Sequence, residues 1–258
     1  MSLLQDRVVL VSGGTQGIGA AVARAAAGAG AAVAVTGRRP EPGEALVDEL
    51  RAAGGRALYV PCDVADVAAI QAGVRTVLAE YGRVDSLVNA AGLTSRGTLL
   101  DTSPELFDEH IAINLRGPFF LMQAVVADLV ARKAHGTIVN IISSSELGGQ
   151  PYLAPYVAAK SGLAGLTRNV AHAHRWDRIR INGLDIGWTD TEGEDATQRE
   201  FHGADDGWRD RAGKALPMGK LGQADEIADF VVFLLSDRSG VVTGSILDWD
   251  QNVFGGLD

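Results

Sequence analysis

The sequence predicts an α/β fold in which about seven parallel strands form a doubly wound sheet with helices on both faces. Short apolar runs rich in β-branched residues alternate along the chain with longer stretches of helical periodicity. Such alternation is typical of a parallel sheet that is covered on both faces. The length of 258 residues suits a single domain, 1–258, and an apolar content of 47% is enough for a buried core.

The first strand and the first helix enclose a glycine-rich turn. An apolar strand at 8–11 is followed by Ser-Gly-Gly-Thr-Gln-Gly-Ile-Gly, and an alanine-rich helix follows at 20–29. In this turn Gly13 permits a tight bend, Gly17 lets the backbone approach a ligand, and Gly19 lets the helix pack closely on the sheet. Free N–H groups at the helix start would suit a diphosphate, although a turn that serves only as a tight corner is the alternative.

The second strand, at 32–36, ends in Gly37-Arg38-Arg39. In dinucleotide-binding sheets this strand end meets the adenosine ribose, where an acidic residue binds the 2′-hydroxyl and an arginine accommodates a 2′-phosphate. Because Arg38 stands there and no acidic residue does, the sequence favours NADP over NAD. Solvated surface arginines are the alternative interpretation.

The other elements follow in the same alternation. We expect further helices at about 44–53, 67–81, 105–114, 117–132, 156–174 and 224–235, and further strands at 56–60, 84–88, 136–143, 179–186 and 245–249. Asp63 follows the third strand, where it would receive an adenine amino group or cap the next helix in competition with Asp66. Asn114 marks a break between two helices, and a polar residue at such a place usually bonds or caps the backbone.

One rim of the sheet collects the polar and glycine-rich segments. Ligands of such sheets bind outside the carboxyl ends of the strands. Six residues fall at these ends, namely Ser12, Gly37, Asp63, Asn89, Ser143 and Gly187. The long polar segment at about 187–216 begins at the same rim, and segments of this length in a compact domain are usually functional lids.

Tyr156 and Lys160 form the most informative pair of side chains. Pro155 predicts a helix that begins at about Tyr156, and residues four apart lie on one helix face. The pKa of a free tyrosine is ~10, and a nearby positive charge favours the phenolate and lowers that pKa. The pair is therefore a candidate general acid/base, although the same spacing occurs by chance on many helix surfaces.

Composition excludes several classes of partner. The net charge of −9 disfavours nucleic acid and anionic membranes. The N-terminus lacks the basic region and long apolar run of a signal peptide, and we find no charge-free apolar run long enough to span a membrane. The single cysteine, Cys62, cannot form an internal disulfide, so we expect a reducing compartment and a cytoplasmic location. The five histidines show no metal-ligand spacing, and we expect surface or capping roles for them.

Five motifs occur in a characteristic order along the chain. They are Gly13-x-x-x-Gly17-Ile18-Gly19, Asn89-Ala90-Ala91-Gly92, Asn114, a serine at the end of the fifth strand, and Tyr156-x-x-x-Lys160. In this order and spacing the chain resembles the short-chain dehydrogenase/reductase family over essentially its whole length. The resemblance implies a seven-stranded Rossmann sheet, a dimer or tetramer, and hydride transfer between nicotinamide C4 and a carbonyl or alcohol carbon.

The resemblance also implies roles for individual residues. Tyr156 would be the acid/base, Lys160 would lower its pKa and hold the nicotinamide ribose, and Asn114 would hold a water that links Lys160 to solvent. The family's catalytic serine lies 13 residues before the tyrosine, which selects Ser143, with Ser145 as the runner-up. The cofactor would contact Tyr156 and Lys160 and also Gly13, Thr15, Gln16, Gly17, Ile18, Gly19, Arg38, Asp63, Val64, Asn89, Ala90, Gly92, Gly187 and Thr191.

Three positions depart from the family pattern. Gln16 stands where many NADP-dependent members carry a basic residue, so the NADP prediction depends on Arg38. Ile186 replaces the proline that usually precedes Gly187, which affects the local geometry of the lid. Ser12 replaces a threonine and keeps the hydroxyl.

The substrate is a small carbonyl compound or alcohol of unspecified structure. We expect specificity to depend on 95–98, 146–153 and 189–216, with Ser145, Trp188 and His202 as candidate contacts. Two alternatives to an NADP-dependent enzyme stay open. One is an NAD-dependent dehydrogenase of the same family, and the other is a dinucleotide-sensing protein without catalysis.

Overall fold

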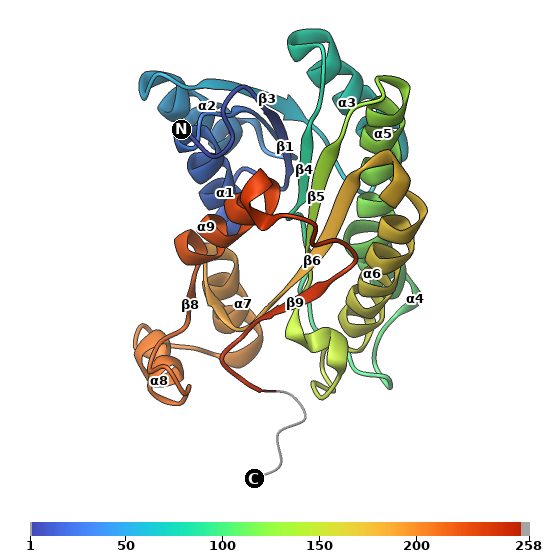
Figure 1. Ribbon diagram of the computed structural model, residues 1–258. Coiled ribbons are helices and arrows are strands. Elements are labelled where there is room, and N and C mark those ends of the chain that lie inside the picture. Colours follow the sequence, from blue (N-terminus) through green and yellow to red (C-terminus); the bar gives the residue numbers. More distant parts are fainter. Residues whose placement is uncertain (1, 254–258) are drawn as a thin grey trace.

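A computed structural model describes residues 2–253 and contains the predicted parallel sheet (Figure 1). Its seven strands lie in the order β3-β2-β1-β4-β5-β6-β9, and every neighbouring pair is parallel. The strands are β1 (Val8–Ser12), β2 (Ala32–Gly37), β3 (Arg56–Pro61), β4 (Ser86–Asn89), β5 (Gly136–Ile141), β6 (Ile179–Ile186) and β9 (Ile246–Trp249). Because all of them run the same way, their carboxyl ends meet at one rim.

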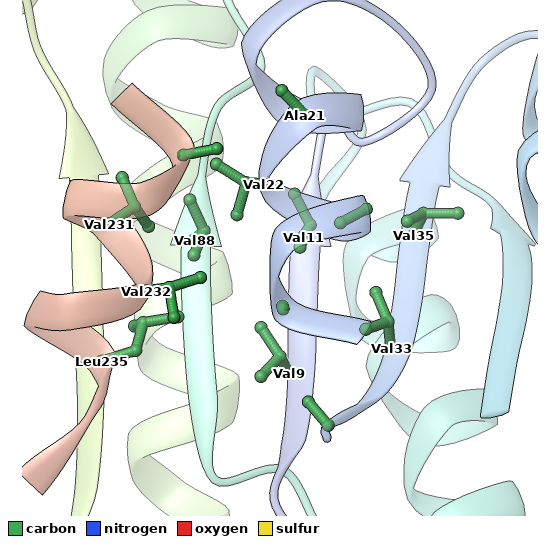
Figure 2. Close-up of a cluster of buried hydrophobic side chains, with 14 of the residues drawn as sticks. Val9, Val11, Ala21, Val22, Val33, Val35, Val88, Val231, Val232 and Leu235 are labelled. Carbon is green, nitrogen blue, oxygen red and sulfur yellow. The ribbon is translucent and has the colours of Figure 1, made fainter. Parts of the chain in front are cut away.

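Helices cover both faces of the sheet, as the alternating pattern predicts. One face carries α1 (Gly17–Gly28), α2 (Pro40–Ala52) and α9 (Ala224–Leu235), and the other carries α3 (Val67–Tyr81), α5 (Gly117–Ala131) and α6 (Ala154–Ala173). Successive side chains of a strand point to opposite faces. Accordingly, Val9 and Val11 of β1 pack beneath α1 and α9 in the cluster of Figure 2, whereas Leu10 belongs to the core of the other face.

The break expected at Asn114 is wrong. The chain passes from α4 (Pro104–Ile111) through a π-helical turn (Ala112–Arg116) directly into α5. By length and mean hydropathy (1.3), the continuous helix Pro104–Ala131 is long and apolar enough to cross a membrane. Half of its most apolar window is buried within the protein, with Leu121 and Leu129 in the core, so a core helix accounts for the same composition.

Two helices begin earlier than the sequence predicts. Proline is tolerated in the first helical turn, where its missing N–H has no intrahelical acceptor. Consequently α2 starts at Pro40 rather than near 44, and α6 starts at Ala154 with Pro155 in its first turn. Helix α6 thus begins two residues earlier than predicted, and Tyr156 and Lys160 lie near its start.

The predicted lid at 187–216 has regular structure of its own. It contains β7 (Thr189–Asp190), α7 (Glu192–His202) and α8 (Trp208–Lys214), and β7 pairs with β8 (Gly222–Gln223). A small apolar cluster around Trp208 holds α8 in place. In Figure 1, α7 and α8 lie beyond the rim formed by the strand ends.

Candidate active site

A cavity of about 1570 Å³ opens at the carboxyl ends of the strands. It is lined by eighteen of the residues predicted from the sequence: Gly13, Thr15, Gln16, Gly17, Ile18, Arg38, Asp63, Val64, Ala90, Gly92, Ser143, Ser145, Tyr156, Lys160, Gly187, Trp188, Thr191 and His202. These residues come from most of the sheet's strand ends, from α6 and from the lid. Gly19, Asn89 and Asn114 do not line it.

The glycine-rich turn fits a diphosphate. Gly13 and Gly17 have φ values of 70° and 51°, the left-handed region that favours glycine. A side chain on Gly19 would collide with the carbonyl oxygen of Gly13, so Gly19 serves the packing of α1 against the turn. The N-cap residue Gln16 makes no capping hydrogen bond to the described residues, and the first turn of α1 carries no acidic side chain. The free N–H groups at the start of α1 therefore lie at the cavity, together with the positive end of the helix dipole.

Gly13→Ala is expected to lower the free energy of unfolding by about 1–3 kcal/mol. The new Cβ would lie 2.5 Å from the backbone nitrogen of Ala91 at a left-handed φ. Gly28→Ala is the matched control, because a Cβ there meets nothing within 4 Å among the described atoms. Alanine at that helical position should raise the free energy of unfolding by less than about 1 kcal/mol. Denaturant unfolding of both variants measures the difference, and equal effects would contradict the role assigned to Gly13.

Two arginines stand at the end of β2. Arg38 and Arg39 are both exposed and line the cavity. Arg39 donates a hydrogen bond to the side-chain oxygen of Gln16. Gln16, which replaces a basic residue of the family pattern, thus holds a second guanidinium beside the glycine turn, a contact that the sequence analysis missed.

Asp63 stays at the cavity and does not cap a helix. Its carboxylate accepts a hydrogen bond from the backbone nitrogen of Ala65 at 2.9 Å, within the loop after β3. The N-cap of α3 is Asp66, which accepts from the backbone nitrogen of Ala68 at 2.8 Å. The capping alternative for Asp63 is therefore excluded.

Asn89 lies behind the wall of the cavity. Its side-chain nitrogen donates to the side-chain oxygen of Asn140 at 2.7 Å, which ties β4 to β5, while its own side-chain oxygen has no partner within residues 2–253. The structure therefore gives this residue a supporting position, and Ala90 and Gly92 form the cavity surface next to it.

Tyr156, Lys160 and Ser143 meet at the inner end of the cavity. Tyr156 and Lys160 are buried on one face of α6, and a hydrogen-bonding interaction with the Ser143 side chain lowers the pKa of Tyr156. The ammonium nitrogen of Lys160 donates to the carbonyl oxygen of Ile141 at 2.8 Å and lies 5.6 Å from the centroid of the Tyr156 ring. The predicted convergence of these three side chains is present.

Desolvation, and not the expected effect of Lys160, dominates the pKa of Tyr156 in this structure. Burial raises the pKa of Tyr156 to about 12, and the hydrogen bond with Ser143 opposes that rise. Burial likewise lowers the pKa of Lys160 to about 8. Desolvation dominates because both groups lie in the protein interior, so Tyr156 is a protonated phenol at neutral pH, which is the form that can donate a proton.

Ser143 is favoured over Ser145 as the serine beside Tyr156. The hydroxyl of Ser145 donates to the side-chain oxygen of Gln150, and the residue is buried. Ser143 is half-buried, lowers the pKa of Tyr156 through a hydrogen-bonding interaction, and donates to the hydroxyl of Ser145 at 3.2 Å. Ser145 therefore orients Ser143 and shapes the pocket from behind.

Asn114 belongs to a buried hydrogen-bond network. The sequence predicted a backbone bond for Asn114 but not the contribution of His110. Its side chain accepts from the nitrogen of Leu93 at 2.9 Å and donates to the oxygen of Leu93 at 3.0 Å. The same nitrogen bonds the ring of His110 at 3.1 Å, and that ring also contacts Ser95. His110 is fully buried, so its expected surface or capping role is wrong. The contact could have been predicted from the sequence because His110 stands four residues before Asn114 and therefore lies on the same helix face.

Polar contacts within the lid join β7, α7 and α8 to one another. Arg209 forms ion pairs with Asp190 at 2.7 Å and Asp195 at 2.9 Å. The hydroxyl of Thr191 caps α7 by accepting from the backbone nitrogen of Glu194 at 3.0 Å. Ile186, where the family has proline, continues β6 in register with Trp249 up to the start of the lid.

Known proteins resemble the chain over nearly its full length. The sequence profile of the family described as enoyl-(acyl carrier protein) reductase matches residues 13–252. An uncharacterized oxidoreductase of Thermotoga maritima is 35% identical over 95% of this chain and 96% of its own. The short-chain reductase protein NovJ of Streptomyces niveus is 34% identical over 97% and 95%.

A solved structure shows the same architecture. A variant of actinorhodin polyketide ketoreductase, solved with NADPH, superposes with a TM-score of 0.92 at 32% identity, covering 99% of this chain and all of that one. Within residues 2–253, we find no cluster of three His, Cys, Asp or Glu side chains that could hold a metal ion. On the profile match, the sequence identities and the shared sheet, the chain belongs to the short-chain dehydrogenase/reductase family of NAD(P)-binding oxidoreductases.

Proposed function

We propose that the protein is an NADP(H)-dependent oxidoreductase that interconverts a carbonyl compound and its secondary alcohol. The observation that carries this proposal is the meeting of Ser143, Tyr156 and Lys160 in the cavity that also holds the glycine-rich turn. A dinucleotide-sensing protein would need the turn but would have no use for a buried proton donor beside a serine and a lysine.

Tyr156 is the proton donor in the direction of reduction. Its phenol is protonated because burial raises its pKa to about 12, and a hydrogen-bonding interaction with Ser143 opposes that rise. A carbonyl oxygen placed between the two hydroxyls would accept a hydrogen bond from each, which polarises the carbonyl carbon. When bound, the nicotinamide cofactor supplies the hydride that this carbon accepts. The proton then leaves the phenol oxygen for the substrate oxygen, and the positive charge of Lys160 stabilises the phenolate.

The rest of the cavity provides contacts for a dinucleotide. The turn from Gly13 to Ile18 would bind the diphosphate, and Asp63 and Val64 would contact the adenine. Gly187 and Thr191 at the start of the lid would contact the nicotinamide end. In this arrangement Lys160 would exchange its present acceptor, the carbonyl oxygen of Ile141, for the ribose hydroxyls.

Arg38→Ala is expected to weaken NADPH binding by about 10–100-fold and to leave NADH binding nearly unchanged. A charge-assisted hydrogen bond to the 2′-phosphate is worth roughly 1.5–3 kcal/mol, and NADH lacks that phosphate. Titrating each cofactor by its fluorescence measures both dissociation constants. Arg75→Ala, an exposed arginine of α3 outside the cavity, is the control. Equal losses for the two cofactors would contradict the role of Arg38.

The proposed activity is tested by initial rates with both cofactors on a panel of ketones, aldehydes and secondary alcohols, followed by nicotinamide absorbance. Turnover that is faster with NADPH supports the proposal, and faster turnover with NADH identifies the NAD-dependent alternative. Tight binding of a dinucleotide without turnover of any compound would instead favour the sensor.

A homo-oligomer and a cytoplasmic location are further parts of the proposal. An apolar groove between the α4–α5 helix and α6, with Leu115, Phe119 and Leu166 in its lining, supports self-association through this face. The lone Cys62, buried and unable to form an internal disulfide, is compatible with a reducing compartment.

A further inference from the structure

Arg96, Tyr152 and His202 come from three distant segments and lie together at the entrance of the cavity that contains Tyr156. The guanidinium carbon of Arg96 lies 5.2 Å from the centroid of the Tyr152 ring, a stacking distance. The rings of Tyr152 and His202 are 5.5 Å apart in an edge-to-face arrangement. Arg96 and Tyr152 lie in the segments 95–98 and 146–153, which the sequence assigned to substrate specificity without singling out either residue.

The guanidinium of Arg96 is held in place but not neutralised. Its Nε donates to the Nε2 of His202 at 3.3 Å, and its Nη1 donates to the backbone oxygen of Thr94 at 2.8 Å. A guanidinium has five N–H donors, so three remain for a ligand. No carboxylate of the described residues forms an ion pair with Arg96.

The carboxylate of Glu194, which also lines the cavity, does not occupy these donors. One of its oxygens accepts hydrogen bonds from the indole nitrogen of Trp188 at 2.7 Å and from the side chain of Gln198 at 2.8 Å. Glu194 is thus committed to the lid. The cavity keeps a free guanidinium although the chain as a whole carries a net charge of −9.

We propose that Arg96 binds an anionic group of the substrate, so that the carbonyl compound reduced here carries a carboxylate or a phosphate. The planar fork of a guanidinium matches either oxyanion with two parallel hydrogen bonds. The stack on Tyr152 and the bond to His202 orient this fork before the ligand arrives, which reduces the entropic cost of binding. This inference depends on the proposed carbonyl reduction for its reacting group.

The anionic group and the reacting carbonyl belong to one small molecule. The charge of Arg96 lowers the pKa of Tyr156, opposing the effect of burial, so the guanidinium lies within electrostatic reach of the phenol. Both residues line the same cavity. The anion would therefore bind at the entrance while the carbonyl reaches the hydroxyls of Ser143 and Tyr156.

The test compares binding and turnover of charged and neutral partners. The ligands are keto acids of increasing chain length from pyruvate to levulinate, their methyl esters, and a ketone that bears a phosphate monoester. Calorimetry on the protein saturated with oxidised NADP measures binding without reduction, and separate assays with NADPH measure turnover. The wild type is compared with Arg96→Gln and with Arg75→Gln, which removes the same charge from an exposed position on α3.

We expect the best acid to bind at least tenfold more tightly than its ester, and Arg96→Gln to abolish that preference. Arg75→Gln should retain it. The relative affinities of the keto acid and the phosphate monoester identify which anion the site prefers. Arg96→Lys keeps the charge without the planar fork and should lose part of the preference, which covers the case in which Arg96→Gln fails to fold.

Equal binding of acids and esters by the wild type would overturn the inference, as would an acid preference that survives in Arg96→Gln. If acids bind through Arg96 but no ketone is reduced with either cofactor, the anion site stands and the proposed reductase activity fails. If neutral ketones are reduced as well as acids and Arg96→Gln changes nothing, the reductase stands and the anion site fails.

Discussion

Tyr156→Phe is expected to lower kcat for the best ketone of the panel by about 10²–10⁴-fold, the usual contribution of a positioned general acid. The change removes one oxygen atom and leaves the ring, which packs edge-on against His110 with 6.1 Å between ring centroids. Because the cavity wall keeps its shape, NADPH binding should change by only a few-fold.

The measurement combines steady-state rates with a fluorescence titration of NADPH. A loss of turnover together with retained cofactor binding separates a missing proton donor from a damaged fold. Tyr81→Phe is the matched control, since this tyrosine ends α3 away from the cavity and the chemical change is the same. Turnover of Tyr156→Phe within tenfold of the wild type would remove the tyrosine from the proposed mechanism.

Asp185→Asn is expected to stabilise the protein at pH 8 by up to about 4 kcal/mol more than at pH 4. Asp185 lies on β6, is 1% exposed, and neither of its carboxylate oxygens has a hydrogen-bond partner in the described part of the chain. It faces α6 on the same side of the sheet as Ile181, below Lys160. An isolated buried carboxylate is costly when ionised.

The charged groups around Asp185 explain the direction of the effect. Burial is the largest cause that raises the pKa of Asp185, the carboxylates of Glu146, Asp248 and Asp250 also raise it, and the ammonium of Lys160 lowers it; the net result is a pKa raised from 3.8 to about 7. Between pH 3.8 and about 7 the folded protein keeps a proton that the unfolded chain has lost. Stability from this group is therefore complete below pH 3.8 and is lost as the pH rises through about 7.

Asparagine has nearly the same shape as aspartate and does not titrate. The stability of Asp185→Asn should therefore not show this decrease with rising pH. Denaturant unfolding of the wild type and Asp185→Asn at pH 4 and pH 8 measures how much the variant changes the free energy of unfolding at each pH. The window stops at pH 8 because the pKa of Lys160, lowered by burial to about 8, adds a dependence of opposite sign above it. Asp229→Asn, an exposed carboxylate on α9, is the control. Parallel pH dependences for the wild type and Asp185→Asn would show that Asp185 is not the group responsible.

Local patterns in the sequence were sufficient for the parallel sheet and for the rim that carries the cavity. Strand and helix periodicity depend on neighbouring residues, so the order of elements could be read without knowledge of their packing. The shared face of Tyr156 and Lys160 follows from the helical repeat alone. The glycine turn was recognisable because a strand and a helix flank it in the chain.

The properties of the site that depend on distant contacts could not be read in this way. Asn114 lies within a continuous helix, and its side chain bonds the backbone of Leu93, 21 residues away in the sequence. The pKa of Tyr156 rises because packing removes the phenol from water, whereas the sequence suggested a decrease from Lys160. Desolvation depends on every segment that covers a group, and no local spacing encodes it.

The same dependence on distant contacts explains why the sequence indicates the family and its cofactor but not the substrate. Membership of the dehydrogenase/reductase family, and with it a nicotinamide cofactor, followed from motifs whose residues are close in the chain. The substrate end of the cavity brings Arg96, Tyr152 and His202 together from three segments, and its free guanidinium becomes visible only when the chain is folded. Motifs of neighbouring residues thus indicate the family, while long-range packing sets the charge and burial at the proposed substrate end of the cavity.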